Sequence, residues 1–191
     1  MPDTRLDHAF FAQPAIELAQ GLLGTIMVRT VGAQVRRARI VEVEAYLGPR
    51  DLASHSSKGR TARTEIMFGP PGHAYVYFIY GMHWMFNIVC GVRGEAHAVL
   101  IRAAQPLDGW EADLRGPARL ASAFEITREH NGIDLVTDEI AFLRNDPHKP
   151  RVLKTRRVGV DYAGHWKSRL LRFVDEANSP PHPPTRDFHL G

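Results

Sequence analysis

The 191-residue sequence predicts an α+β fold, in which a mostly antiparallel, curved sheet is flanked by helices and carries a protruding β-hairpin. Strand-like segments outnumber helical ones, and two pairs of them are separated only by short turns, at Gly32 and Gly81. We find neither an internal repeat nor a linker long enough to divide the chain, and a chain of this length forms one core. We therefore expect a single domain over residues 1–191, with its body at about residues 10–174.

The first predicted helix lies near the N-terminus, after a partly ordered lead-in at residues 1–12. Pro14 suits the first turn of a helix and Gly24 can end it. Between them, apolar residues recur at helical spacing: Ala15, Leu18, Ala19 and Leu22.

The longest predicted strand, residues 34–46, forms a hairpin with residues 25–31 around residues 31–33. Side chains alternate along a strand, so Val41, Val43 and Ala45 share one face, and Ile40, Glu42, Glu44 and Tyr46 share the other. The second face thus aims carboxylates and a flat ring at one region of space. The alternative is that the two acids are solvated partners for the neighbouring arginines.

The most aromatic part of the chain predicts the protruding hairpin. Residues 74–80 and 83–90 are strand-like and are joined at Gly81-Met82. A Gly-X pair suits a type II′ turn, which places Tyr80 at or beside the tip. The polar, basic residues 48–64 are expected to form a loop.

Residues 97–104 are expected to form a strand, followed by two helices. The strand has Leu100, Arg102 and Ala104 on one face. The first helix covers residues 106–115. The second begins at Pro117 and stops at Asn131-Gly132. Its apolar stripe consists of Leu120, Ala121 and Phe124.

The C-terminal part is expected to contain three short strands, at residues 139–143, 155–160 and 170–174. Residues 175–191 form a tail with four prolines between positions 180 and 184 and little apolar content. We expect this tail to be disordered or loosely docked.

The composition, 44% hydrophobic and 24% charged, is that of an ordinary globular protein. No apolar run approaches the roughly 20 residues of a membrane span, and the N-terminus has no apolar signal-peptide core. The single cysteine, Cys90, permits no internal disulfide and suits a reducing compartment. We expect a cytoplasmic or nucleoid location, or a nuclear one in a eukaryote, with no membrane partner.

The net charge of +3 conceals two basic blocks. Residues 36–63 hold seven basic and three acidic side chains, and residues 149–172 hold eight and one. Residues 64–148 between them hold six basic and eleven acidic side chains. This asymmetry favours a polyanion bound on one face, although solvated surface is the alternative for either block alone.

Five ordered segments carry a resemblance to a known family. They read I-V-E-V-E-A-Y-L-G-P-R-D-L-A-S-H, M-F-G-P-P-G-H-A-Y-V-Y-F-I-Y-G-M-H-W-M-F-N-I-V-C, V-L-I-R-A-A-Q-P-L, G-P-A-R-L and R-V-G-V-D-Y-A-G-H-W. Together they resemble the 3-methyladenine (alkyladenine, or methylpurine) DNA glycosylase family, from about Phe10 to Phe173.

The resemblance implies a catalytic pair. The second acid of E-x-E-A-Y, Glu44, matches the general base that activates a water for hydrolysis of the N-glycosidic bond. Glu42 is then a support or salt-bridge partner. Arg102 matches an arginine that helps to hold the water, together with a main-chain carbonyl of Val158 or Val160. A structural ion pair is the alternative for Arg102.

The resemblance also implies a pocket for a flipped purine. Tyr46 and Tyr77 would sandwich the base, and His55 would stack and offer a hydrogen-bond donor. Asn87 matches an asparagine that would collide with the exocyclic amine of guanine. The alternatives are aromatic core residues and a cross-strand hydrogen bond at Asn87.

The candidate DNA contacts begin with Tyr80, which would fill the gap that the flipped nucleotide leaves. The family often has tyrosine where this chain has His83, which puts hydrogen bonding at the minor-groove edge in doubt. The candidate backbone contacts are Met82, His83, Arg36, Arg63, Lys154 and Arg156.

We therefore expect a monofunctional DNA glycosylase that flips alkylated or deaminated purines out of double-stranded DNA. No lysine in the matched segments could form a Schiff base, so no lyase activity is expected. No cofactor or metal site is expected, and the protein should be monomeric. The alternatives are a non-catalytic DNA-distortion binder with the same wedge and a small-molecule nucleosidase.

Overall fold

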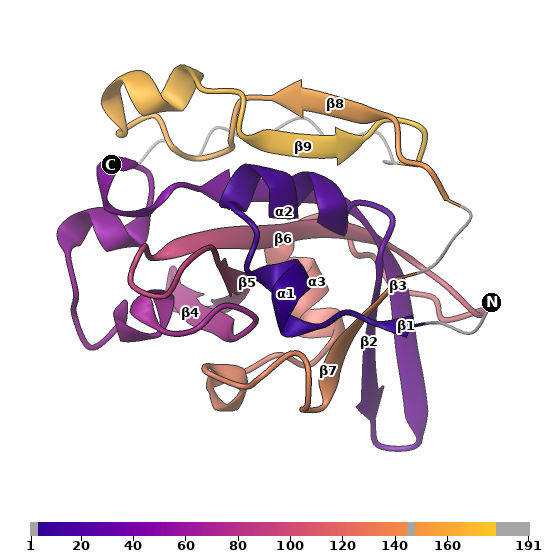
Figure 1. Cartoon of the computed structure of the whole chain (residues 1–191). Coiled ribbons are helices and arrows are strands. Elements are labelled where there is room, and N and C mark those ends of the chain that lie inside the picture. The colour runs from indigo at the N-terminus through magenta and orange to yellow at the C-terminus, as the bar shows by residue number, and fades with distance from the viewer. Residues whose placement is uncertain (1–3, 145–147, 179–191) are drawn as a thin grey trace.

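Strand β3 (Gln34–Tyr46) is central to the fold, because three other strands pair with it. The computed structural model describes residues 4–144 and 148–178, and in these ranges nine strands form one antiparallel, open sheet. The main path is β1-β7-β2-β3-β6-β5-β4, and β9 pairs with β3 and β8 (Figure 1). The other strands are β1 (Thr4–Arg5), β2 (Ile26–Val31), β4 (Ala74–Ile79), β5 (His83–Cys90), β6 (His97–Pro106), β7 (Ile140–Arg144), β8 (Val152–Thr155) and β9 (Arg172–Asp175).

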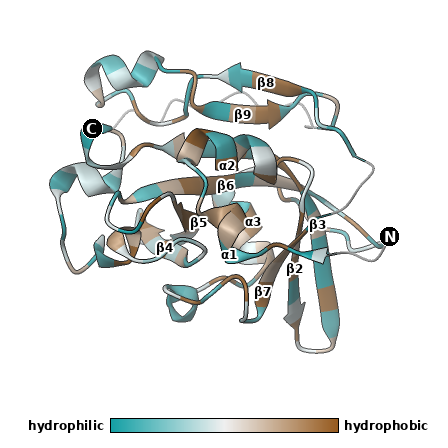
Figure 2. Ribbon diagram, in the orientation of Figure 1, coloured by the Kyte–Doolittle hydropathy of each residue, from teal (hydrophilic) through white to brown (hydrophobic). Residues whose placement is uncertain are grey.

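Short helices cover the sheet and complete the α+β architecture that the sequence predicts. The α-helices are α1 (His8–Phe11), α2 (Ala15–Leu22) and α3 (Pro117–Ala123). The 3₁₀ helices are η1 (Gly48–Arg50), η2 (His55–Lys58), η3 (Glu65–Phe68), η4 (Arg128–His130) and η5 (Gly164–Ser168). Helix α2 packs on β3 and β6, and α3 packs on β5 and β6, so one apolar core joins the helices to the sheet. Apolar residues gather around β5 and these helices, whereas the end of the β2–β3 ribbon is mostly hydrophilic (Figure 2).

Two irregularities in the β3–β6 pairing change which side chains face the core. The paired residues are Ile40 with Ala104, Glu42 with Ala103 and Val43 with Ile101. Val41 is therefore an extra residue in β3, and Arg102 is one in β6. Such bulges shift the two-residue alternation. Ile40 and Ala104 consequently lie in the apolar core, and their predicted places beside Glu42 and Arg102 were wrong.

Residues 106–115 do not form the predicted helix. Asp108 and Gly109 have φ values of 57° and 75°, which a right-handed helix does not accept. The chain turns there, with the Trp110 amide donating to the carbonyl of Leu107. It then runs back along β6, where Arg115 forms a bridge with Ala103.

Helix α3 begins at Pro117 as predicted but ends at Ala123, earlier than the predicted stop at Asn131-Gly132. Glu125 follows with a φ of 51°, and the amides of Glu125 and Ile126 donate back to Ser122 and Ala121. This is a Schellman-type ending. Glycine usually occupies this position after a helix, and because Glu125 occupies it here, the sequence pattern did not indicate the helix end.

Three other terminal or loop predictions need adjustment. Residues 1–12 are more ordered than expected within the described range, since β1 pairs with β7 and Phe11 is fully buried. The predicted strand at residues 155–160 was wrong, because strand β8 ends at Thr155 and residues 156–160 form neither strand nor helix. Of the predicted tail, residues 179–191 lie outside the described residues.

The β4–β5 hairpin forms, but its turn differs from the predicted type. Ile79 pairs with His83, and the Met82 amide donates to the Ile79 carbonyl. The central residues are therefore Tyr80 and Gly81, both with positive φ (54° and 66°). That pattern belongs to a type I′ turn, not the predicted type II′ turn with Gly81 first. Tyr80 thus lies within the turn itself.

Within the described residues, no helix combines the length and apolar character that crossing a membrane requires.

Candidate active site

Two carboxylates, Glu42 and Glu44, lie fully buried beside the bulges of β3 and β6. Arg102 lies between them. Its Nε donates to Glu42 at 2.8 Å, and its Nη1 lies 3.4 Å from an oxygen of Glu44. Glu42 also accepts a hydrogen bond from Arg172 of β9 at 2.7 Å. The two acids are therefore members of a buried ionic network and not solvated surface groups.

The Glu44 carboxylate is held by two hydrogen-bond donors in addition to its ion pair with Arg102. One oxygen accepts from the Tyr46 hydroxyl at 2.9 Å, and the other accepts from the Val158 amide at 2.8 Å. Burial and the Glu44 charge raise the pKa of Tyr46 well above its usual value. Burial lowers the pKa of Arg102, but Glu44 and Glu42 together raise it above its ordinary value. Both groups consequently keep their protons and remain donors to the carboxylate.

A second buried ion pair, between Arg157 and Asp51, holds the residues that contact Glu44. Arg157 donates to both carboxylate oxygens of Asp51, at 2.5 and 2.9 Å, and to the Ala45 carbonyl at 3.0 Å. Its guanidinium lies 4.7 Å from the centroid of the Tyr46 ring. Arg157 precedes Val158, so this pair holds both the ring and the amide that contact Glu44.

A cavity of about 300 Å³ lies above this network. Aromatic rings, a few polar groups and the 158–160 segment line it. The lining includes Tyr46, His55, Tyr75, Tyr77, Tyr80, Asn87, Arg102, Val158, Val160 and Tyr162. The volume is at the small end of the range of ligand sites in proteins. The structure therefore brings every predicted pocket residue, the predicted wedge and Arg102 to one cavity.

His55 stands between two tyrosines in the cavity wall. Its ring lies edge-on to Tyr77 with centroids 4.5 Å apart, and its Nδ1 is 2.9 Å from the Tyr75 hydroxyl. A neutral tyrosine hydroxyl that faces an imidazole nitrogen at this distance can donate its proton to it. Burial, and then the charge of Arg63, lowers the pKa of His55 to about 4. The ring is therefore neutral at pH 7, and the contact favours the tautomer protonated on Nε2.

Asn87 is buried in β5, where it pairs with Tyr75 on one side and Leu100 on the other. Its side-chain amide nitrogen donates to the Tyr75 carbonyl at 3.1 Å. The predicted cross-strand bond is therefore present, and Asn87 also lines the cavity. A side chain fixed by such a bond presents a rigid polar edge.

The hairpin tip exposes large side chains beside the cavity. Tyr80 and Met82 are 69% and 67% exposed, and His83 is also exposed. An aromatic residue with positive φ is uncommon and costs backbone strain. Tyr80 also lines the cavity, so the strained turn keeps a ring at the edge of the candidate site.

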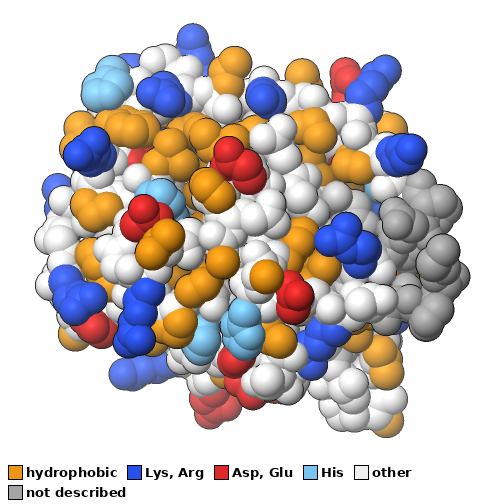
Figure 3. All heavy atoms as spheres, viewed as in Figure 1, with side chains coloured by type: hydrophobic (Ala, Val, Ile, Leu, Met, Phe, Trp, Pro, Cys, Tyr) orange, Lys and Arg blue, Asp and Glu red, His pale blue; other side chains and the backbone are white. Residues whose placement is uncertain are grey.

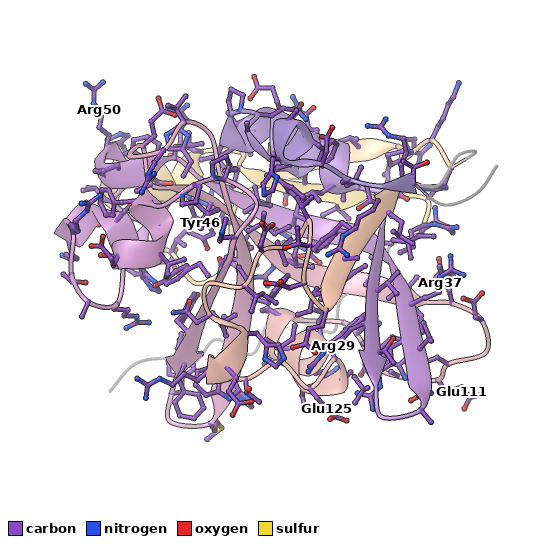
Figure 4. The ribbon with its side chains drawn as sticks, turned by 60° about the horizontal axis from the view of Figure 1, so that its bottom comes forward. Arg29, Arg37, Tyr46, Arg50, Glu111 and Glu125 are labelled. Carbon is purple, nitrogen blue, oxygen red and sulfur yellow. The ribbon has the colours of Figure 1, made fainter. Side chains whose placement is uncertain are left out.

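The other predicted DNA contacts divide into two groups. Lys154 and Arg156 are exposed, and the face in Figure 3 has basic side chains along its upper edge, over η5, β8 and β9. Arg36, in contrast, donates to the Ala123 carbonyl and to Glu125 at 2.6 and 2.8 Å. Glu125 lies beside Arg29 and apart from Tyr46 in Figure 4. We therefore leave Arg36 out of the DNA contacts proposed below.

Sequence reasoning missed several residues of the site. Tyr162 is 70% exposed and lines the cavity, with its hydroxyl 3.3 Å from the Ala53 carbonyl. Asp51 and Arg157 form the supporting pair, although Arg157 belongs to a basic block that was expected to face phosphates. Tyr162 lies in a segment already matched to the family, so an aromatic residue there was the available signal. Asp51 and Arg157 also lie in matched segments, but the sequence does not reveal that they pair, because they are 106 residues apart.

Among the described residues, no group of three or more His, Cys, Asp or Glu side chains could hold a metal ion.

Known proteins resemble this chain over nearly its whole length. Residues 9–179 match the family model described as methylpurine-DNA glycosylase (MPG). A protein of Anaeromyxobacter sp. (strain Fw109-5), provisionally named a 3-methyladenine DNA glycosylase, is 47% identical over 92% of this chain and 91% of its own length. Proteins with the same provisional name in Myxococcus xanthus (strain DK1622) and Legionella pneumophila (strain Corby) are 47% and 42% identical, over 87% and 91% of this chain and 88% and 96% of theirs. The chain therefore belongs to the methylpurine-DNA glycosylase family.

Proposed function

We propose that this protein removes alkylated and deaminated purines from double-stranded DNA by flipping the nucleotide and hydrolysing its N-glycosidic bond. One observation carries the proposal: Glu44 is fully buried, fixed by two hydrogen bonds and an ion pair, and covered by an aromatic cavity. A base-excising enzyme requires this combination of a purine-sized aromatic site and a carboxylate. The names of the relatives, 3-methyladenine DNA glycosylases, support the same substrate class.

Binding begins at the hairpin. Tyr80 inserts into the duplex and replaces the stacking that the flipped nucleotide loses, while Met82 and His83 contact the DNA backbone. Lys154 and Arg156 contact phosphates. Tyr46, His55 and Tyr77 then enclose the purine. The protein acts as a monomer inside the cell, where its DNA substrate is found.

The hydrolysis requires a water on the sugar side of the base. The water oxygen forms a bond to C1′ as the bond from C1′ to the purine nitrogen breaks, and the electron pair leaves with the purine. Glu44 accepts the proton of the water and stabilises the positive charge that develops on the sugar. Arg102 orients Glu44 and the water, together with a carbonyl of Val158 or Val160. No lysine occurs among the described residues that line the cavity, so the reaction ends at the abasic site, without strand cleavage.

The test is a base-release assay with a set of duplexes, each containing one modified purine: 3-methyladenine, 7-methylguanine, hypoxanthine or ethenoadenine. We expect free base and an intact abasic strand from at least one of them. Tight binding of these duplexes without release of any base would support a DNA-distortion binder instead. Cleavage of the DNA strand by the protein itself, without treatment with alkali, would contradict the monofunctional assignment.

Tyr80→Ser is expected to weaken binding and flipping in a lesion duplex but to leave excision from single strands comparatively intact. A single strand is already unstacked and leaves no gap to fill. The measurement compares single-turnover excision of one lesion in the two contexts. An equal loss in both would mark Tyr80 as a pocket or folding residue, as would a lowered melting temperature.

Asn87→Ser is expected to allow slow release of undamaged guanine. Guanine differs from hypoxanthine only by its 2-amino group, and a fixed Asn87 side chain would collide with that group. The scale of one clash or one unpaired polar group is about 1–3 kcal/mol, hence roughly 5- to 150-fold in relative rate. Guanine release from an unmodified duplex is timed for both proteins, with hypoxanthine excision as the control. Unchanged guanine release with retained hypoxanthine activity would limit Asn87 to a strand role.

A further inference from the structure

Arg63 lies directly behind one wall of the cavity. Its guanidinium carbon is 5.1 Å from the centroid of the Tyr77 ring, and burial raises the pKa of the neighbouring Tyr75, which the charge of Arg63 lowers. Tyr75 and Tyr77 both line the cavity, whereas Arg63 does not. Arg63 therefore reaches the cavity only through these two rings.

Among the described residues, Arg63 differs from the other arginines at the site because it has no carboxylate partner. Arg102 is paired with Glu42 and Glu44, and Arg157 is paired with Asp51. Within residues 4–144 and 148–178, no carboxylate lies within ion-pair distance of Arg63. The neighbouring His55 ring is neutral at pH 7 because burial lowers its pKa to about 4. Arg63 is exposed, so solvent screens part of its charge, and the remainder polarises the wall formed by Tyr77.

We propose that Arg63 sets the charge class of the purines that the site accepts, disfavouring cationic bases and favouring neutral ones. This inference rests on the proposed function of the site. Arg63 acts through the ring of Tyr77 and does not itself touch the base.

The direction follows from the charges of the two substrate classes. An N7- or N3-alkylated purine is cationic when it is bound and leaves as a neutral base. A cation on the far side of Tyr77 repels it and weakens its attraction to the ring face. Hypoxanthine is neutral when it is bound and gains negative charge as its bond to the sugar breaks. The same cation then stabilises the transition state.

The experiment compares kcat/KM for 7-methylguanine and hypoxanthine in otherwise identical duplexes, for the wild type and Arg63→Gln. We expect the ratio of the cationic to the neutral substrate to rise about 3- to 30-fold, the range of one cation–π contact. The 7-methylguanine value should rise and the hypoxanthine value should fall. Arg63→Lys keeps the charge and should hold the ratio near that of the wild type.

Arg60→Gln is the matched control. Arg60 lies on the same loop, with its guanidinium carbon 4.9 Å from the centroid of the Phe68 ring, which does not line the cavity. It should leave the ratio unchanged.

The other outcomes contradict the inference in distinct ways. Equal losses on both substrates in Arg63→Gln, with a weaker salt dependence of binding, would mean that Arg63 only contacts a phosphate. An equal shift of the ratio by Arg60→Gln would mean a general surface field. Release of no base by the wild type from any of the four modified duplexes named above would overturn the proposed function itself.

Discussion

Glu44→Gln is expected to lower the excision rate by a factor of about 10² to 10⁴. The amide keeps the shape of the side chain but cannot accept a proton from water. It also loses the negative charge that stabilises the sugar in the transition state. The measurement is single-turnover release of a modified purine from a duplex, with the affinity for the same duplex measured separately. Binding should survive, because the amide has the size of the carboxylate and the side chain is buried beneath the cavity lining.

Glu42→Gln is the matched control, since Glu42 is equally buried and contacts the same arginine at 2.8 Å. Glu42 also binds Arg172, so its loss should lower the melting temperature and misplace Arg102. Its effect on the rate should nevertheless be smaller than that of Glu44→Gln. If Glu44→Gln excises at a near-normal rate while Glu42→Gln does not, the roles of the two acids are reversed.

The main course of the fold could be predicted from the sequence because most strands and α2 obey local periodicity. Residues 34–46 and 25–31 form β3 and β2 as predicted, and all four predicted apolar residues of α2 are buried. The bulges at Val41 and Arg102 could not be predicted in the same way. A bulge depends on the register between two strands, and the pattern of either strand alone does not contain it.

The prediction of a helix at residues 106–115 was wrong for a related reason. Their composition suits a helix, but Leu107 is bound to the Arg37 carbonyl and Leu114 to the Ala104 amide, so neighbouring strands determine their path. Tertiary contacts override local propensity in such a segment.

The site residues were predictable to the extent that each belongs to a segment shared with the family. Tyr46, His55, Tyr77, Asn87 and Arg102 all line the cavity, next to the buried Glu44. The supporting contacts were not predictable. Arg157 resembles its basic neighbours in sequence, and only the fold buries it against Asp51.

Asp51→Asn is expected to destabilise the protein strongly, because it leaves the Arg157 charge buried without a partner. Removal of one member of a buried ion pair costs about 3–5 kcal/mol. For a domain of this size that corresponds to a melting temperature lower by roughly 6–20 °C. Arg157 also contacts the Tyr46 ring and precedes Val158, whose amide holds Glu44. Excision by the folded fraction, measured well below the melting temperature, should therefore fall as well.

The double variant Asp51→Asn/Arg157→Met separates the two effects. Removing the unpaired charge should restore much of the melting temperature, because an apolar group of similar size avoids the cost of a buried cation. Excision should stay low, since methionine cannot donate to the Ala45 carbonyl or hold the 157–158 backbone in place. A single variant that melts within 2 °C of the wild type, an observable difference of less than about 1 kcal/mol, would contradict a buried, unsolvated pair. Full recovery of activity in the double variant would show that the pair stabilises the fold without positioning Glu44.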